Sequence, residues 1–99
     1  MWMVSPKKLC KQHLLGEHFE IHCAVGNLKH TGNWTRGLTK KGFLEPQNFK
    51  KRHQQLVDEM IRRGYKHNSP LKTNTKLVGK VNTGKSIIDL RNRCKNCKV

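Results

Sequence analysis

The sequence predicts an all-α fold: a small single domain over residues 1–99, with three to four helices and a long irregular segment before the last helix. Two observations indicate this. The chain has 99 residues, of which 34% are hydrophobic, so it can bury one small core, and a thin core favours a few long helices over a large sheet. Apolar residues also recur at helical spacing in several stretches, which Gly, Pro, Asn and Ser residues separate.

A first helix is expected over residues 7–25. Ser5 can cap a helix, Pro6 suits its first turn, and only Gly16 interrupts the stretch that follows. This helix is predicted to be apolar on two sides, one formed by Leu14, Ile21 and Val25 and the other by Leu15, Phe19 and Cys23. Between them lies a polar stripe of His13, Glu17 and Glu20. Such a helix is expected to cross the middle of the domain. Its polar stripe then has either a role in the function or a structural role, in which its carboxylates pair with a nearby Lys or Arg.

The later elements follow from the same signals. Residues 26–32 are expected to form a loop, and residues 33–41 a short helix that Gly42 closes. The next helix is predicted to start near Glu45 and Pro46 and to stop at Gly64; its apolar residues are Phe49, Leu56, Val57, Met60 and Ile61. Residues 66–84 are expected to be irregular, with the apolar anchors Leu71, Leu77, Val78 and Val81. A last short helix is expected over residues 85–93, with Ile87 and Leu90 facing inward.

Charge is the strongest functional signal. The chain has 21 Lys and Arg residues against 6 Asp and Glu, a formal net charge of +15. Such a charge repels itself unless a polyanion relieves it, and the usual polyanion is the phosphate backbone of a nucleic acid. A membrane surface is the weaker option, because no predicted helix has a clean apolar face set against a purely basic one. No stretch approaches the ~20 apolar residues of a membrane span. With no signal peptide visible, a cytoplasmic protein of a bacterial, archaeal or virus-infected host cell is expected.

Two metal-binding interpretations must be weighed. The first helix is rich in ligand types (His13, Glu17, His18, Glu20 and His22), but the His-Glu-x-x-His zinc pattern is absent, so surface histidines are the favoured interpretation. Cys94 and Cys97 form half a zinc site, which Cys10 and His13 have the matching spacing to complete. That arrangement would take His13 away from an active site. Reduced, unliganded thiols are therefore favoured, and no metal is expected.

Two segments resemble one known family. Residues 12–20, Gln-His-Leu-Leu-Gly-Glu-His-Phe-Glu, resemble the first helix of the pyrimidine-dimer DNA glycosylases, the phage endonuclease V family. In that helix a histidine, an apolar pair and a glutamate precede the catalytic glutamate. Residues 51–65 are similar to a later family helix that ends in Arg-Gly-aromatic. The two segments occur in the family's order.

The resemblance implies a DNA-repair enzyme, a glycosylase with abasic-site lyase activity on pyrimidine dimers in double-stranded DNA. In the family a nucleotide flips out, an N-terminal α-amine attacks the sugar C1′, a Schiff base forms, and β-elimination cuts the strand. Glu20 takes the place of the family's catalytic glutamate here. The amine is that of Met1, because Trp2 is too large for normal removal of Met1. The substrate-binding residues are then Trp2, His13, Glu17, His18, Lys51 and Arg52. A monomer that needs no cofactor is expected.

The sequence departs from the phage enzymes at Phe19, where they have arginine, and at the C-terminus, where Cys94 and Cys97 replace an aromatic, basic segment. Two other functions therefore remain open. A non-catalytic DNA-binding protein would explain the charge equally well, but not the polar stripe. A nucleic-acid-binding adaptor stapled by zinc is the other alternative.

Overall fold

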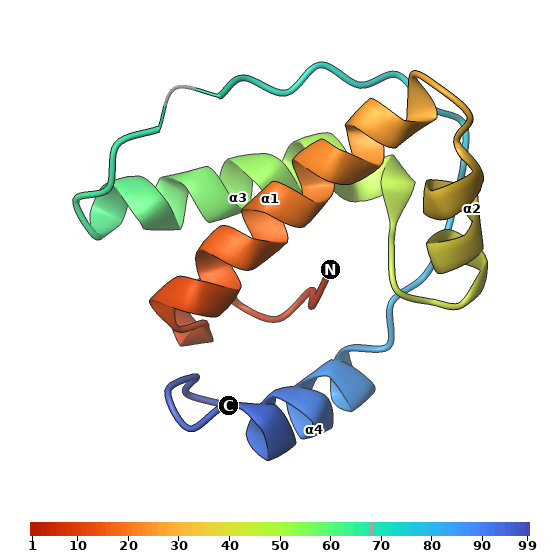
Figure 1. Ribbon diagram of the computed structural model, residues 1–99. Helices are drawn as coiled ribbons and strands as arrows, with labels where there is room; N and C mark the ends of the chain where they lie inside the picture. Colours follow the sequence, from red (N-terminus) through yellow and green to blue (C-terminus); the bar gives the residue numbers. More distant parts are fainter. Residues whose placement is uncertain (68) are drawn as a thin grey trace.

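The computed structural model describes residues 1–67 and 69–99. Within these ranges the chain is all-α, as predicted, with four α-helices and no strand: α1 (Lys11–Leu28), α2 (Asn33–Lys40), α3 (Phe49–Arg62) and α4 (Thr83–Arg93). Two short 3-10 helices, η1 (Pro6–Lys8) and η2 (Pro46–Asn48), precede α1 and α3. Helix α1 crosses α3 and packs against α2, while α4 lies on the other side of the N-terminal segment (Figure 1).

The first helix begins later and ends later than predicted. Ser5 makes no side-chain cap, and Pro6–Lys8 closes a 3-10 turn. The backbone of Leu9 and Cys10 is then extended, so α1 starts at Lys11. At the other end, the helix continues to Leu28, through part of the predicted loop. A Cβ added at Gly26 would meet no atom within 4 Å, and the backbone there is helical. This glycine therefore does not end the helix.

Only one of the two predicted apolar sides of α1 faces the core. Leu14, Ile21 and Val25 are buried, and Leu15 is half-buried against the core. Phe19 and Cys23 are exposed, Phe19 by 68%, so the prediction of a second buried side is wrong. The reason is that α2 and α3 both pack on the first side of α1, and in the described part of the chain no helix covers Phe19.

Helices α2 and α3 form close to where the sequence places them. Gly42 and Gly64 have φ angles of 82° and 86°, a left-handed conformation that favours glycine and ends a helix. The apolar face of α3 packs on α1, with Phe49 and Leu56 fully buried. Ile61, predicted to belong to this face, is 59% exposed, because it lies one position beyond the buried row that ends at Met60.

The irregular segment after α3, described over residues 65–67 and 69–82, is an extended strap along one side of the molecule (Figure 1). Residue 68 of the predicted 66–84 range lies outside the described residues. Gln47 fixes the strap by exchanging two hydrogen bonds with the Gly79 backbone, at 2.6 and 3.0 Å. Glu45 fixes it by accepting the Val81 N–H at 2.7 Å. The strap thus carries the chain to α4, with Val81 buried and Val78 exposed.

Helix α4 begins two residues before its predicted start. The Asn82 side chain caps it by accepting the Lys85 N–H at 3.1 Å. Leu90 is fully buried and Ile87 is half-buried, so the predicted inward pair is confirmed. Figure 1 shows α4 standing apart from the crossed helices, with the N-terminus between them.

Candidate active site

A pocket of about 970 Å³ lies between the N-terminal half of α1, the turn after α2, and α4. The polar stripe of α1 forms one wall, because His13, Glu17 and Glu20 all line it. Met1 and Trp2 lie in the pocket as well. A volume of this size lies at the upper end of the range for small-molecule pockets. The pocket therefore has room for an extruded nucleotide.

The N-terminus lies against the Glu20 carboxylate of α1. The Met1 α-amine forms an ion pair with Glu20 Oε1 and donates a hydrogen bond to the Phe43 carbonyl at 2.9 Å. The Met1 side chain is buried, and its Sδ accepts the Glu45 N–H at 3.3 Å. Met3 has a φ of 57°, and this bend accompanies the return of the chain over α1.

Beneath Glu20, a buried ion pair joins α1 to α3. Arg52 donates two hydrogen bonds to the Glu17 carboxylate, at 2.5 and 2.9 Å, and both side chains are almost completely buried. Glu17 also accepts the Trp2 N–H at 3.2 Å. The pair thus fixes the crossing of the two helices and the backbone that follows Met1.

The rim of the pocket is strongly basic. Lys41 follows α2, Lys80 lies at the end of the strap, and Lys85 and Arg93 belong to α4. Only Asp89 on α4 adds a carboxylate to this wall among the described residues. Cations in this arrangement favour a phosphate backbone, whose contacts position a protein on DNA. The sequence interpretation missed all four cations, because they belong to segments without a motif.

The predicted substrate-binding residues divide into two groups. Trp2, His13 and Glu17 line the pocket, and the Trp2 and His13 rings meet edge to face with centroids 5.7 Å apart. Lys51 is exposed on α3 and does not line the pocket. Arg52, expected to contact DNA, is instead buried against Glu17, so its guanidinium is not available to a phosphate.

His18 lies outside the pocket, in a cluster of four histidines. His18 and His22 come from α1, His53 from α3, and His67 from the start of the strap. Burial, with the neighbouring imidazoles, lowers the pKa of His18 to about 4. Burial also lowers the pKa of His22 and His53, so these three rings are neutral at neutral pH. The interpretation of His18 and His22 as surface histidines is wrong.

A second group of ligand-type side chains lies at the edge of the pocket. Cys10, His13, Cys94 and Cys97 bring one ligand atom each within 4.8 Å of one another. The Nδ1 of His13 faces this group, at 3.1 Å from Cys10 Sγ. Cys23, the remaining cysteine, is exposed elsewhere on α1.

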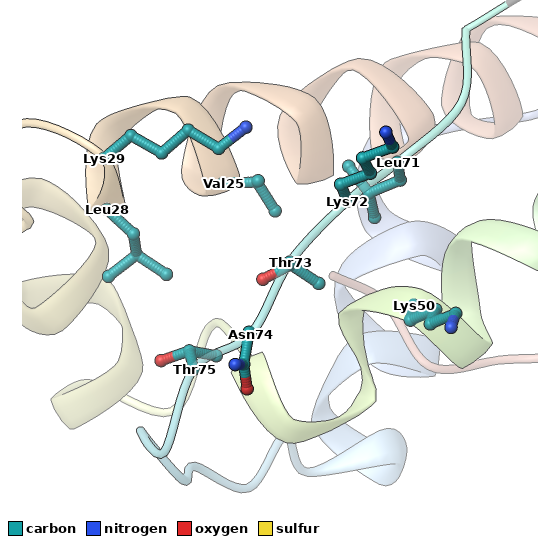
Figure 2. A pocket seen from close by; sticks show the side chains of 9 residues that line it. All are labelled: Val25, Leu28, Lys29, Lys50, Leu71, Lys72, Thr73, Asn74 and Thr75. Carbon is teal, nitrogen blue, oxygen red and sulfur yellow. The ribbon is translucent and has the colours of Figure 1, made fainter.

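A separate cavity of about 550 Å³ lies beneath the strap (Figure 2). Its lining includes Val25, Leu28 and Lys29 of α1, Lys50 of α3 and residues 71–75. Figure 2 shows apolar side chains and strap threonines around it, with lysines at its border. None of these side chains is a carboxylate, thiol or imidazole, and the ionisable groups of this lining are the amines of Lys29, Lys50 and Lys72.

Comparison with known proteins gives a family match. The model of a family described as pyrimidine dimer DNA glycosylase matches residues 1–73. This range includes Met1, Glu20 and the whole α1–α3 frame. No curated protein and no solved structure matches the chain. No helix in the described ranges is both long enough and apolar enough to cross a membrane.

Proposed function

The chain belongs to the pyrimidine dimer DNA glycosylase family, and from this premise we propose that it is a bifunctional enzyme. It would remove a base at pyrimidine dimers in duplex DNA and then cut the strand at the abasic site, using a Schiff base on the Met1 α-amine. One observation carries the proposal: this amine and the Glu20 carboxylate form an ion pair in a pocket with a basic rim.

The pair contains the groups that the first step needs. Glu20 takes a proton from the ammonium group of Met1, which frees the nitrogen lone pair for attack on the sugar C1′. The glycosidic bond breaks, its electron pair leaves with the base, and the base takes the proton that Glu20 accepted, so that Glu20 is again a carboxylate. The nitrogen passes its second proton to O4′ as the C1′–O4′ bond breaks and the sugar ring opens to the protonated Schiff base. The Glu20 carboxylate meanwhile lies beside the positive charge that develops on the sugar.

Strand cleavage follows from the same arrangement. A base removes a proton from C2′, the C3′–O bond breaks, and the 3′ phosphate leaves with the bonding electrons. Water then hydrolyses the Schiff base and restores the free amine of Met1. We assign the C2′ proton transfer to Glu20, because its side chain lines the pocket and is 37% exposed.

The walls of the pocket suit a flipped nucleotide in damaged duplex DNA. Lys41, Lys80, Lys85 and Arg93 would hold the phosphates on either side of the lesion. Flipping costs a few kcal/mol and is easiest where stacking is already disturbed. Trp2, beside the nucleophile and half-buried, would fill the space that the extruded nucleotide leaves.

Borohydride trapping tests the mechanism. Reduction should link the protein covalently to a duplex that contains an abasic site or a pyrimidine dimer, and mass spectrometry should locate the adduct on the α-nitrogen of Met1. Glu20→Gln should keep DNA affinity but lose turnover by a factor on the order of 10² or more. Asp58→Asn, which alters an exposed carboxylate on α3, is the matched control and should retain full activity.

N-terminal acetylation separates the amine mechanism from the alternatives. Intact mass first establishes that the purified chain begins at Met1. If the acetylated protein still forms a borohydride adduct, a lysine is the nucleophile and the proposed role of Met1 is wrong. If the unmodified protein binds damaged and undamaged duplexes equally and cuts neither, it is a DNA-binding protein without catalysis.

A further inference from the structure

Three thiols and one imidazole converge where the chain's last turn meets the start of α1. Cys10 is the N-cap of α1, and His13 lies in its first turn; Cys94 is the C-cap of α4, and Cys97 lies three residues later. From this convergence we propose that Cys10, His13, Cys94 and Cys97 bind one zinc ion in a tetrahedral Cys₃His site. Such sites are typical of structural zinc.

The distances between the ligand atoms fit one tetrahedral ion. With Zn–S bonds of about 2.3 Å, two sulfurs in a tetrahedron lie about 3.8 Å apart, and a sulfur and an imidazole nitrogen about 3.6 Å. The Cys10 and Cys94 sulfurs are 3.7 Å apart. His13 Nδ1 lies 3.5 Å from Cys97 Sγ and 3.1 Å from Cys10 Sγ. The sulfurs of Cys10 and Cys94 are not bonded to each other.

Backbone N–H groups point at the sulfurs as they do around a bound metal. The Asn96 N–H lies 3.4 Å from Cys94 Sγ, and the Cys10 N–H lies 3.2 Å from Cys97 Sγ. Donors of this kind stabilise thiolates and orient them for coordination. A hydrophobic role for these cysteines would require no such donors.

The site explains how the C-terminal part of the chain is held. Helix α4 buries only Ser86 and Leu90, and apart from the cluster a backbone hydrogen bond from Lys98 to Lys8, at 2.7 Å, joins the last turn to η1. A bound zinc ion would add a second link, because two of its ligands come from the start of α1 and the other two from the turn after α4. If the proposed function holds, the zinc ion would keep helix α4, with Lys85 and Arg93, in place on the side of the pocket that faces Met1 and Glu20.

Cobalt spectroscopy and metal analysis test the site. Protein purified without chelator should contain zinc bound to this cluster, and Co²⁺ exchanged into it should show intense thiolate-to-cobalt charge-transfer absorption. Cys97→Ser should lose that absorption and one zinc per chain. Cys23→Ser, which removes the exposed cysteine outside the cluster, should lose neither.

A second pair of variants covers the case in which Cys97→Ser does not fold. His13→Cys preserves a four-ligand site and should retain zinc, whereas His13→Ala should bind it at least 10-fold more weakly. The proposal is overturned if the wild-type protein gives no charge-transfer band with Co²⁺. It is also overturned if intact mass shows a disulfide among Cys10, Cys94 and Cys97.

The four-histidine cluster carries a second, independent inference. His18 Nε2 lies 2.8 Å from His67 Nε2 and 3.2 Å from His53 Nε2, and the nitrogens of His22 and His53 are 3.2 Å apart. Four imidazole nitrogens on one tetrahedral zinc lie about 3.3 Å from one another. All four ligand atoms are Nε2 and lie within 4.8 Å of one another. We infer that this cluster binds a second zinc ion, which joins α1, α3 and the start of the strap.

The same metal analysis separates this site from the first. His67→Asn, chosen because His67 lies outside the helices, should lose one zinc per chain and keep the thiolate charge-transfer absorption of the Co²⁺ form. His30→Asn, a change at an exposed histidine, is the control and should lose no metal. If His67→Asn retains the wild-type zinc content, the histidine site is refuted while the cysteine site stands.

Discussion

Arg52→Ala is expected to destabilise the protein far more than Lys51→Ala, although the two residues are neighbours on α3. Arg52 is 3% exposed and donates two hydrogen bonds to Glu17, whose side chain is fully buried. Removing Arg52 leaves a carboxylate without a counter-charge between α1 and α3. Among the described residues, only the Trp2 N–H, at 3.2 Å, still donates to it. Lys51 is exposed, so its loss leaves no buried group unpaired.

The size of the effect follows from the burial of the pair. Breaking a buried ion pair by removing one partner costs about 3–5 kcal/mol, whereas exposed substitutions usually change stability by less than about 0.5 kcal/mol. Domains of this size have a total free energy of unfolding of about 5–15 kcal/mol. At about 4–8 °C per kcal/mol for a small domain, Arg52→Ala should lower the Tm by more than about 10 °C.

Urea denaturation followed by circular dichroism measures the effect, with Lys51→Ala as the matched control. A double variant, Glu17→Leu with Arg52→Leu, should recover much of the loss, because buried pairs replaced by apolar residues are often neutral. If Arg52→Ala loses less than about 1 kcal/mol, or if the double variant is less stable than Arg52→Ala, then the pair does not anchor the helix crossing.

Three further predictions concern other parts of the molecule. The guanidinium of Arg62, and then that of the next arginine, lowers the pKa of buried Glu59 from its ordinary 4.5 to about 2, so this carboxylate stabilises the fold above pH 4.5 and the stabilisation disappears as the pH falls through about 2. The difference in Tm between wild type and Glu59→Gln should therefore shrink from about pH 5 to pH 2, and a constant difference would contradict this. Lys85→Ala should reduce the slope of log K against log salt for DNA binding by about 1; an unchanged slope would mean that this lysine contacts no phosphate. A Cβ at Gly79 would lie 2.6 Å from a side-chain carbon of α2, so Gly79→Ala should lose about 1–3 kcal/mol in urea denaturation, whereas Gly37→Ala, with open space around it, should gain about 0.5–1 kcal/mol. Equal effects of the two glycine substitutions would show that the close approach does not constrain the strap.

Much of the fold was predictable because it depends on local signals. The spacing of His13, Glu17 and Glu20 on one helix face required only helical geometry, and the structure places all three in one pocket. The ends of α2 and α3 near Gly42 and Gly64 also follow from a local rule, the preference of glycine for positive φ. The pairing of the Met1 amine with Glu20 could be expected only from the family resemblance, since the turn at Met3 has no sequence signal.

The features that were missed depend on which elements meet. His18 and His22 share a helix face, but their partners lie more than thirty residues away on α3 and the strap. Phe19 is apolar and correctly spaced, yet it is exposed because no helix of residues 1–67 and 69–99 reaches that side of α1. Arg52 has the composition of a DNA contact, and only the approach of α3 to Glu17 removes it from the surface. No periodicity in the sequence contains this information.

The pocket around Met1 is lined by two stretches of the chain that contribute differently to the buried core. The family match stops at residue 73, whereas Lys80, Lys85 and Arg93 come after it. The late stretch supplies few of the buried residues that hold the crossed helices together. Substitutions in this stretch are therefore expected to change the wall of the pocket that faces Met1 without moving the crossed helices.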